Sequence, residues 1–151
     1  MDQPSDLRVM IVEDQALLAM ELELMLAEAG CDVVGCAMDE ASALAVADRE
    51  RPQLALIDVN LLDGMTGPQI ARRLIDAHGS TVVFITANPE QIPDGFAGAL
   101  GVLSKPFDEQ TIHAIVAFAR EFILHRTLGD PPRRFQLAPG LTLRRDDIAP
   151  H

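Results

Sequence analysis

The 151-residue chain has no tryptophan, no tyrosine, and only one lysine among its twelve basic residues. No apolar run approaches the roughly 20 residues that cross a bilayer, and no basic start followed by an apolar run marks a leader. We therefore expect a cytoplasmic chain without membrane contact. The two cysteines, Cys31 and Cys36, lie in one predicted strand and point to opposite faces, so we expect buried, unbridged thiols.

Positive charge is scarce as well. The chain carries 23 acidic residues against 12 basic ones, which gives a formal net charge of -11 at pH 7. Such a chain repels phosphate backbones unless it has a separate basic patch. The one arginine-rich region lies near the C-terminus and consists of Arg133, Arg134, Arg144 and Arg145. Four arginines among proline, glycine and aspartate make a thin basic patch, so we predict no nucleic-acid partner.

The chain does contain a regular alternation of short apolar runs and amphipathic stretches. The run at 7–12 is continuously apolar except for Arg8, which is typical of a strand buried on both faces. The expected strands are 7–12, 31–38, 53–58, 81–86 and 101–104, and the expected helices are 15–29, 39–51, 66–78 and 108–126. This order predicts an α/β fold, a doubly wound five-stranded parallel sheet with helices on both faces.

The segment 88–100 fits this alternation poorly, although it should hold the fourth helix. It contains Pro89, Pro93, Gly95 and Gly98, all of which are costly in a helix interior. We predict a short or irregular element there.

The character of the chain changes after Arg126, where proline and glycine interrupt every regular pattern. We expect one domain over 1–126 and a tail over 127–151. Within this tail, the runs 135–137 and 141–143 could form small strands around the Pro139–Gly140 turn. The alternatives are a disordered tail or one docked on a partner.

Polar residues follow the predicted strands at the points where they end. Glu13 and Asp14 follow the first strand, Asp58 and Thr86 end the third and fourth, and Lys105 follows the last. The carboxyl ends of parallel strands meet at one edge of a sheet, where such folds place their active crevice. We therefore expect these five side chains in one site.

Three carboxylates in one crevice repel each other unless a cation compensates them. Oxygen ligands suit Mg²⁺, which binds one or two protein carboxylates directly and leaves room for water and phosphate. We predict Asp14 and Asp58 as direct ligands, Glu13 as a ligand through water, and the backbone carbonyl of Asn60 as a further one.

An aspartate beside magnesium can act as a nucleophile toward a phosphoryl donor. Phosphoryl transfer then requires in-line placement and neutralisation of charge. Lys105 supplies a compact ammonium group and Thr86 a small hydroxyl, each able to contact a phosphoryl oxygen. The set predicts that Asp58 is a phosphoryl acceptor.

Four sequence motifs strengthen this interpretation: IVEDQ at the first strand end, LIDVNLLDGMTG around Asp58, VFITA around Thr86, and LSKPF around Lys105. In this ordered set, over residues 7–126, the chain resembles the receiver domain of two-component response regulators. The resemblance implies Asp58 as the phosphorylated aspartate, a magnesium site at Glu13, Asp14 and the Asn60 carbonyl, and a cis Lys105–Pro106 peptide. It implies phosphate from a histidine kinase or histidine phosphotransfer protein, and no enzymatic activity beyond self-phosphorylation and slow autodephosphorylation.

The sequence departs from the family pattern at Val102, where many receivers have tyrosine or phenylalanine three residues before the lysine. The pair Phe84 and Thr86, with the proline-rich segment 88–100, resembles an alphaproteobacterial subgroup that carries a Phe-x-Thr pattern. We expect switching in such a protein to depend on reordering of 88–100.

Two other functions fit the fold. A flavodoxin-like cofactor binder holds phosphate after the first strand, where Glu13 and Asp14 would repel it. An aspartate-based phosphatase usually has a second acid two residues after its nucleophile, where this chain has Asn60. With no output domain apparent after the receiver, we expect output through a protein contact or service as a phosphate sink.

Two helices are expected to carry apolar residues outside the core. In the helix 15–29, one stripe should pack on the sheet, while Leu17, Met20 and Leu24 fall nearly opposite. This second stripe could be covered by loops, or could dock a kinase helix or the second subunit of a homodimer. In the helix 108–126, Phe118 and Leu124 lie away from the core stripe and could contact the tail or such a partner.

Overall fold

The computed structural model describes residues 6–142, apart from the exposure of Gly140 and the side chain of Thr142. Within this described range the chain forms six strands, five helices and two short 3₁₀ segments. The strands are β1 (Leu7–Val12), β2 (Cys31–Ala37), β3 (Leu54–Ile57), β4 (Thr81–Thr86), β5 (Gly101–Ser104) and β6 (Phe135–Leu137). The helices are α1 (Ala16–Glu28), α2 (Glu40–Glu50), α3 (Gly67–His78), α4 (Glu109–His125) and α5 (Pro139–Thr142), and the 3₁₀ segments are η1 (Pro89–Gln91) and η2 (Asp94–Gly98).

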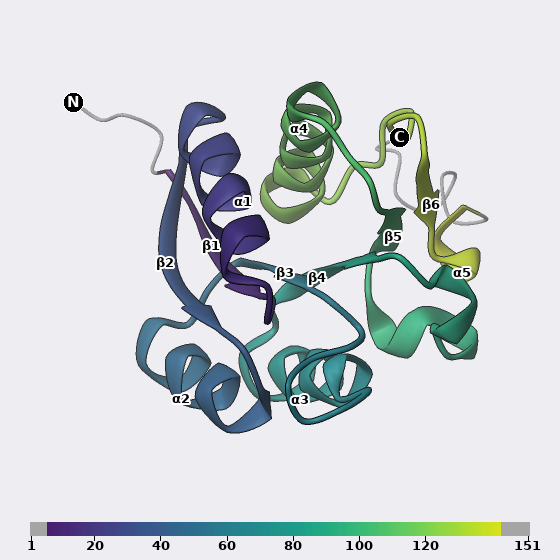
Figure 1. Ribbon diagram of the computed structural model, residues 1–151. Coiled ribbons are helices and arrows are strands. Elements are labelled where there is room, and N and C mark those ends of the chain that lie inside the picture. Colours follow the sequence, from purple (N-terminus) through teal and green to yellow (C-terminus); the bar gives the residue numbers. More distant parts are fainter. Residues whose placement is uncertain (1–5, 143–151) are drawn as a thin grey trace.

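The sheet has the order β2-β1-β3-β4-β5-β6, and its first five strands are all parallel. Helices α1 and α4 cover one face of the sheet, and α2 and α3 cover the other (Figure 1). β1, β3, β4 and β5 are mostly buried because each lies between two apolar layers, whereas the edge strand β2 is partly exposed. The doubly wound parallel sheet predicted from the sequence is confirmed.

Local sequence explains where several helices begin and end. The Asp39 side chain accepts a hydrogen bond from the Ser42 N–H at 3.0 Å and caps α2, while Asp108 caps α4 through the Thr111 N–H at 2.8 Å. Gly30 follows α1 with φ of 86°, a left-handed conformation that glycine adopts without a steric penalty.

No regular helix forms between β4 and β5, as the prolines and glycines of this segment predict. In its place lie η1 and η2. Three consecutive residues of η2, Gly95, Phe96 and Ala97, have left-handed backbones with φ of 76°, 55° and 51°. Such a conformation costs a residue with a side chain roughly 1–2 kcal/mol, so η2 carries local backbone strain.

The tail adds a sixth strand that the sequence analysis did not place in the sheet. β6 pairs antiparallel with β5, so that Phe135 lies opposite Leu103. Phe135 packs so close to Gly101 that a Cβ on this glycine would collide with its ring. The expected small strand over 135–137 is confirmed. The one expected over 141–143 is wrong, because residues up to Thr142 form the short helix α5 and Leu143 lies outside the described residues.

Phe118 on α4 meets Phe135 edge to face, with ring centroids 5.6 Å apart and an interplanar angle of 63°. The expected contact between Phe118 and the tail is therefore confirmed. Phe118 and Phe135 are both buried, so the pair attaches β6 to the receiver fold.

We expect a double-mutant cycle of Phe118→Leu and Phe135→Leu to give a coupling of about 0.5–1.5 kcal/mol, the usual contribution of such aromatic pairs. Urea unfolding of the four proteins measures it. A coupling near zero would contradict a docked tail. As a matched control, Phe118→Leu combined with Leu62→Ala, an exposed loop residue, should show additive effects.

Two further expectations from the sequence concern the second stripe of α1 and the two cysteines. Leu17, Met20 and Leu24 of α1 are 70%, 60% and 66% exposed, so the second stripe of this helix is uncovered, as one alternative predicted. Cys31 is buried, but Cys36 is exposed, so the expectation of two buried thiols is wrong. The reason is that β2 is an edge strand of the sheet.

Candidate functional site

The ammonium group of Lys105 lies between two buried carboxylates at the carboxyl edge of the sheet. Its Nζ is 2.7 Å from Asp58 Oδ2 and 3.1 Å from Glu13 Oε1. The backbone brings these residues together because the Asp58 N–H bonds the carbonyl of Val12 on β1, and the Lys105 N–H bonds the carbonyl of Thr86 on β4. The carboxyl ends of β1, β3 and β5 thus bring all three side chains to one point, with β4 lying between β3 and β5.

A cavity of about 180 Å³ opens beside this network. Of the predicted site residues, Asp14, Asp58, Asn60 and Lys105 line it. Glu13 is buried behind it and accepts a hydrogen bond from the Gln15 N–H at 3.1 Å.

The loop after Asp58 is held close to the site. The Asn60 N–H lies 3.3 Å from Asp58 Oδ1, and Gly67 at the start of α3 donates its N–H to the carbonyl of Val59. A side chain on Gly67 would collide with the backbone of Asp58 and Val59. Glycine at this position therefore allows α3 to approach the loop that carries Asp58.

Thr86 ends β4 as a fully buried residue and does not line the cavity. Its Oγ1 accepts a hydrogen bond from the Asn88 N–H at 3.0 Å. A hydroxyl has one donor besides its acceptor sites, so Thr86 can still donate to an incoming oxygen.

Two residues of the segment after β4 contact the site and were missed in the sequence. Asn88 lines the cavity, and Gln91 of η1 accepts a hydrogen bond from the Asn60 side chain at 2.8 Å. The position of Asn88, two residues after Thr86, is the one signal that could have indicated it. The Gln91 contact spans 31 positions and has no local sequence signal.

Burial and charge act in opposite directions on the ionisable groups of the site. Removal from water raises the pKa of Glu13, the negative charge of Asp58 raises it further, and hydrogen bonds from Gln15 and Lys105 oppose the rise. For Lys105, burial lowers the pKa, but the hydrogen bonds and charges of Asp58 and Glu13 together raise it. Lys105 therefore stays charged at neutral pH.

The donor set fits a divalent cation. One carboxylate oxygen each from Glu13, Asp14 and Asp58 lies within 4.8 Å of the others. One ammonium group faces three carboxylates, so the site stays negative when all are ionised. Carboxylate oxygens beside a cavity with room for water are the ligands that Mg²⁺ prefers.

The sequence of residues 9–117 matches the family described as the response regulator receiver domain. The chain belongs to this family. Its members act in two-component signalling and are activated by phosphorylation, and receiver domains generally bind Mg²⁺ at an acidic pocket. The Lys105–Pro106 peptide is cis, as the resemblance implied.

The curated relatives include the phyllosphere-induced regulator PhyR of Methylorubrum extorquens, 34% identical over 116 residues, with 76% of this chain and 43% of the relative covered. The transcriptional regulatory protein PdtaR of Mycobacterium tuberculosis is 35% identical over 105 residues, with coverages of 66% and 50%. The chain thus spans about half the length of the curated relatives it matches.

Among solved structures, the receiver domain of PhyR from Erythrobacter litoralis aligns with a TM-score of 0.71 and 29% identity, covering 84% of this chain and 95% of that one. PhyR from Brucella abortus aligns with a TM-score of 0.66 and 30% identity, over 80% and 53%. These similarities confirm the receiver fold. Within residues 6–142, no helix has the length and hydropathy of a bilayer span.

The raised pKa of Glu13 makes a pH prediction for the metal-free protein. A raised pKa in the folded state means that folding favours the protonated Glu13 carboxyl. The protonated carboxyl stabilises the fold fully below the ordinary pKa of 4.5, and this contribution is lost as pH rises through the folded-state pKa. We expect Glu13→Gln to be more stable than wild type at pH 7 in EDTA, and the difference to shrink toward pH 4. Thermal unfolding across this range measures it. A Gln variant less stable than wild type at pH 7 would contradict the argument.

Proposed function

We propose that Asp58 is the phosphoryl acceptor of this receiver. A carboxylate oxygen of Asp58 attacks the phosphorus atom of the donor, the bond from phosphorus to the donor breaks, and the leaving group keeps the electron pair. The product is an aspartyl phosphate. The observation that carries this proposal is the 2.7 Å contact between Asp58 Oδ2 and the Lys105 ammonium at the cavity.

The surrounding residues have separate roles in this proposal. Glu13, Asp14, Asp58 and the backbone carbonyl of Asn60 would hold Mg²⁺, which would supply positive charge to the phosphoryl oxygens. Lys105 moves from its carboxylate partners to a phosphoryl oxygen and neutralises its charge. Thr86 turns its hydroxyl proton toward another oxygen while keeping the Asn88 N–H as its donor.

The donor class follows from the family, whose members receive phosphate from histidine kinases or related phosphotransfer proteins. We propose that the phosphorylated receiver signals by contact with a partner protein. We also propose that residues 1–126 and the tail packed on them form one domain. The uncovered α1 stripe of Leu17, Met20 and Leu24 supports a contact with a protein partner, because exposed apolar groups of this size gather at interaction sites.

The readout in this proposal lies in the segment between β4 and β5. Val102 is buried in the usual place of the aromatic switch residue, so no aromatic ring there can report on Thr86. The segment is instead joined to the site by the contacts of Asn88 with Thr86 and of Gln91 with Asn60. When Thr86 rotates its hydroxyl toward the phosphoryl group, the Asn88 N–H that it holds shifts with it, and the strained turn at Phe96, farther along the same segment, can reorder.

Incubation with acetyl phosphate and Mg²⁺ tests the proposed function. We expect the intact mass to increase by one phosphoryl group, EDTA to prevent the increase, and hydroxylamine to reverse it because it cleaves acyl phosphates. Absence of the mass increase with Mg²⁺ present would refute the proposal. Hydrogen exchange of 88–100 in the same samples tests the readout, since unchanged exchange on phosphorylation would separate this segment from the switch.

A further inference from the structure

A larger cavity, of about 470 Å³, lies at the opposite edge of the sheet. It is bordered by Thr81, the first residue of β4, whereas Thr86 at the other end of this strand belongs to the candidate site. The full length of β4 therefore separates the two cavities. Nothing in the phosphorylation chemistry uses this second one.

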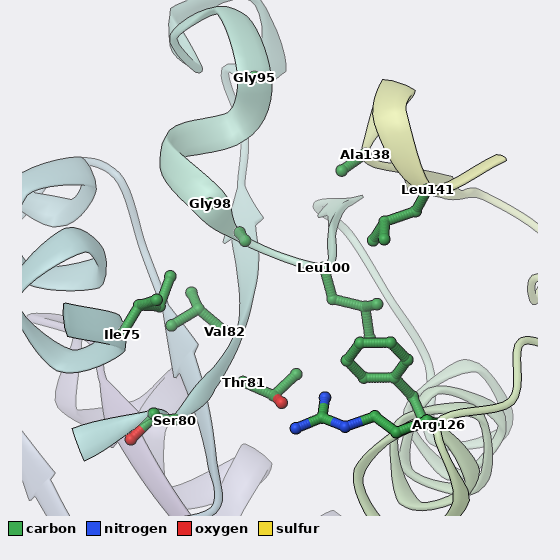
Figure 2. A pocket seen from close by; sticks show the side chains of 13 residues that line it. Ile75, Ser80, Thr81, Val82, Gly95, Gly98, Leu100, Arg126, Ala138 and Leu141 are labelled. Carbon is green, nitrogen blue, oxygen red and sulfur yellow. The ribbon is translucent and has the colours of Figure 1, made fainter. Parts of the chain in front are cut away.

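The walls of this cavity are mainly apolar. Figure 2 shows Ile75, Val82, Leu100 and Leu141 arranged around it, with the turn of Gly95 and Gly98 at one side. Ala138 and Leu141 come from the tail, so the cavity is completed by the docking of β6 and α5 on the receiver. Its volume is within the range of roughly 300–1,000 Å³ that small-molecule sites occupy.

The guanidinium group of Arg126 lies at this cavity. Arg126 follows α4, and its Cζ lies 5.0 Å from the centroid of the Phe122 ring, a cation–π contact that holds the group in place. In Figure 2 the guanidinium of Arg126 points toward the side chain of Thr81. Among the residues that the structure describes, no carboxylate forms an ion pair with Arg126.

The charges around this cavity favour a ligand with a single negative charge. No aspartate or glutamate among residues 6–142 lines the cavity, and Arg72 places a guanidinium nitrogen 3.3 Å from where a Cβ on Gly98 would lie. The net charge of -11 opposes ligands with several negative charges. A single carboxylate on an apolar body matches both the guanidinium and the apolar walls, because arginine binds carboxylates through two parallel hydrogen bonds.

We propose that this cavity binds a small apolar monocarboxylic acid, with its carboxylate on Arg126 and its hydrocarbon body between Val82, Leu100 and Leu141. Because the tail supplies part of the wall, the ligand stabilises the docked tail by mass action. The receiver thus carries a second input, a free organic acid, at the end of the sheet remote from phosphorylation.

Calorimetric titration of the full chain with octanoate tests the proposal, with octanamide as the uncharged probe of the same length. A charge-assisted pair of this kind corresponds to about a tenfold to hundredfold difference in affinity. We expect octanoate to bind at least about tenfold more tightly than octanamide. Failure of octanoate to bind, or equal affinity for both probes, would overturn the proposal.

Two matched variants locate the site. Arg126→Gln should weaken octanoate about tenfold or more and leave octanamide unchanged, while Arg133→Gln, an exposed tail arginine outside the cavity, should change neither. Ala138→Leu should fill the cavity and weaken both probes, with circular dichroism to check its fold. If Ala138→Leu unfolds, the arginine pair still decides, because octanoate binding that is insensitive to Arg126→Gln refutes the assignment.

Discussion

Replacing Asp58 by asparagine is expected to reduce phosphorylation by acetyl phosphate to background while the protein stays folded. The amide is a poor nucleophile, so no acyl phosphate forms. The fold should survive because asparagine keeps the shape of aspartate and an oxygen for the Asn60 N–H. The pKa of Glu13 is raised mainly by burial, and the change removes the Asp58 charge that raises it further, while Lys105 keeps its contact with Glu13 at 3.1 Å. Intact-mass analysis and thermal unfolding measure the two effects.

A neighbouring aspartate provides the control. Asp63 lies five residues later and accepts hydrogen bonds from the Thr66 hydroxyl and the Glu40 N–H, outside the cavity. Asp63→Asn should be phosphorylated like wild type. A full phosphoryl gain in Asp58→Asn would show that the acceptor is another residue. Asp14, the half-buried carboxylate of the same cavity, would then be tested next.

The proximity of Glu13, Asp58 and Lys105 could be predicted from the sequence because it follows from strand order. Glu13, Asp58 and Lys105 each follow a buried apolar run, and parallel strands place such positions at one edge whatever the details of packing. The contacts of Lys105 with both carboxylates require only that β1, β3 and β5 be parallel and close in the sheet. The sequence motifs and the strand order therefore predict the same group of side chains at the carboxyl edge of the sheet.

The parts that the sequence could not predict depend on contacts between distant segments. β6 is three residues long, too short for a periodic pattern, and it is a strand because the edge of β5 offers unpaired backbone groups. The helix α5 replaces an expected strand because the apolar residue Leu141 faces the cavity rather than a partner strand. The bond between Asn60 and Gln91 likewise depends on the irregular path of η1.

These contacts between distant segments also determine where the second cavity lies. Sequence motifs drew attention to the carboxyl edge, where the chemistry of the site is concentrated. The opposite cavity exists only after the tail has packed beside α4, and Arg126 there has no motif around it. The sequence motifs of this chain therefore carry no information about the second cavity.

The second large effect is expected from Lys105→Met in the absence of metal. Lys105 is 15% exposed, and its partners Asp58 and Glu13 are 7% and 2% exposed, so solvent screens this network weakly. Removal of the ammonium leaves two buried carboxylates without their cation. Breaking a buried ion pair from one side costs about 3–5 kcal/mol. Urea unfolding at pH 7 in EDTA should show a loss of this size, and phosphorylation should also fall, because Lys105 neutralises the incoming phosphoryl group.

An exposed pair calibrates this loss. Arg49 is 63% exposed and lies 3.1 Å from a Glu50 carboxylate oxygen, so Arg49→Met should cost less than about 1 kcal/mol. Magnesium distinguishes charge from packing in the Lys105 variant. A cation that binds the folded site alone restores stability by mass action, so added Mg²⁺ should recover part of the loss in Lys105→Met and change Arg49→Met no more than wild type. A loss that Mg²⁺ does not reduce would mean that the lysine stem, rather than its charge, supports this edge of the sheet.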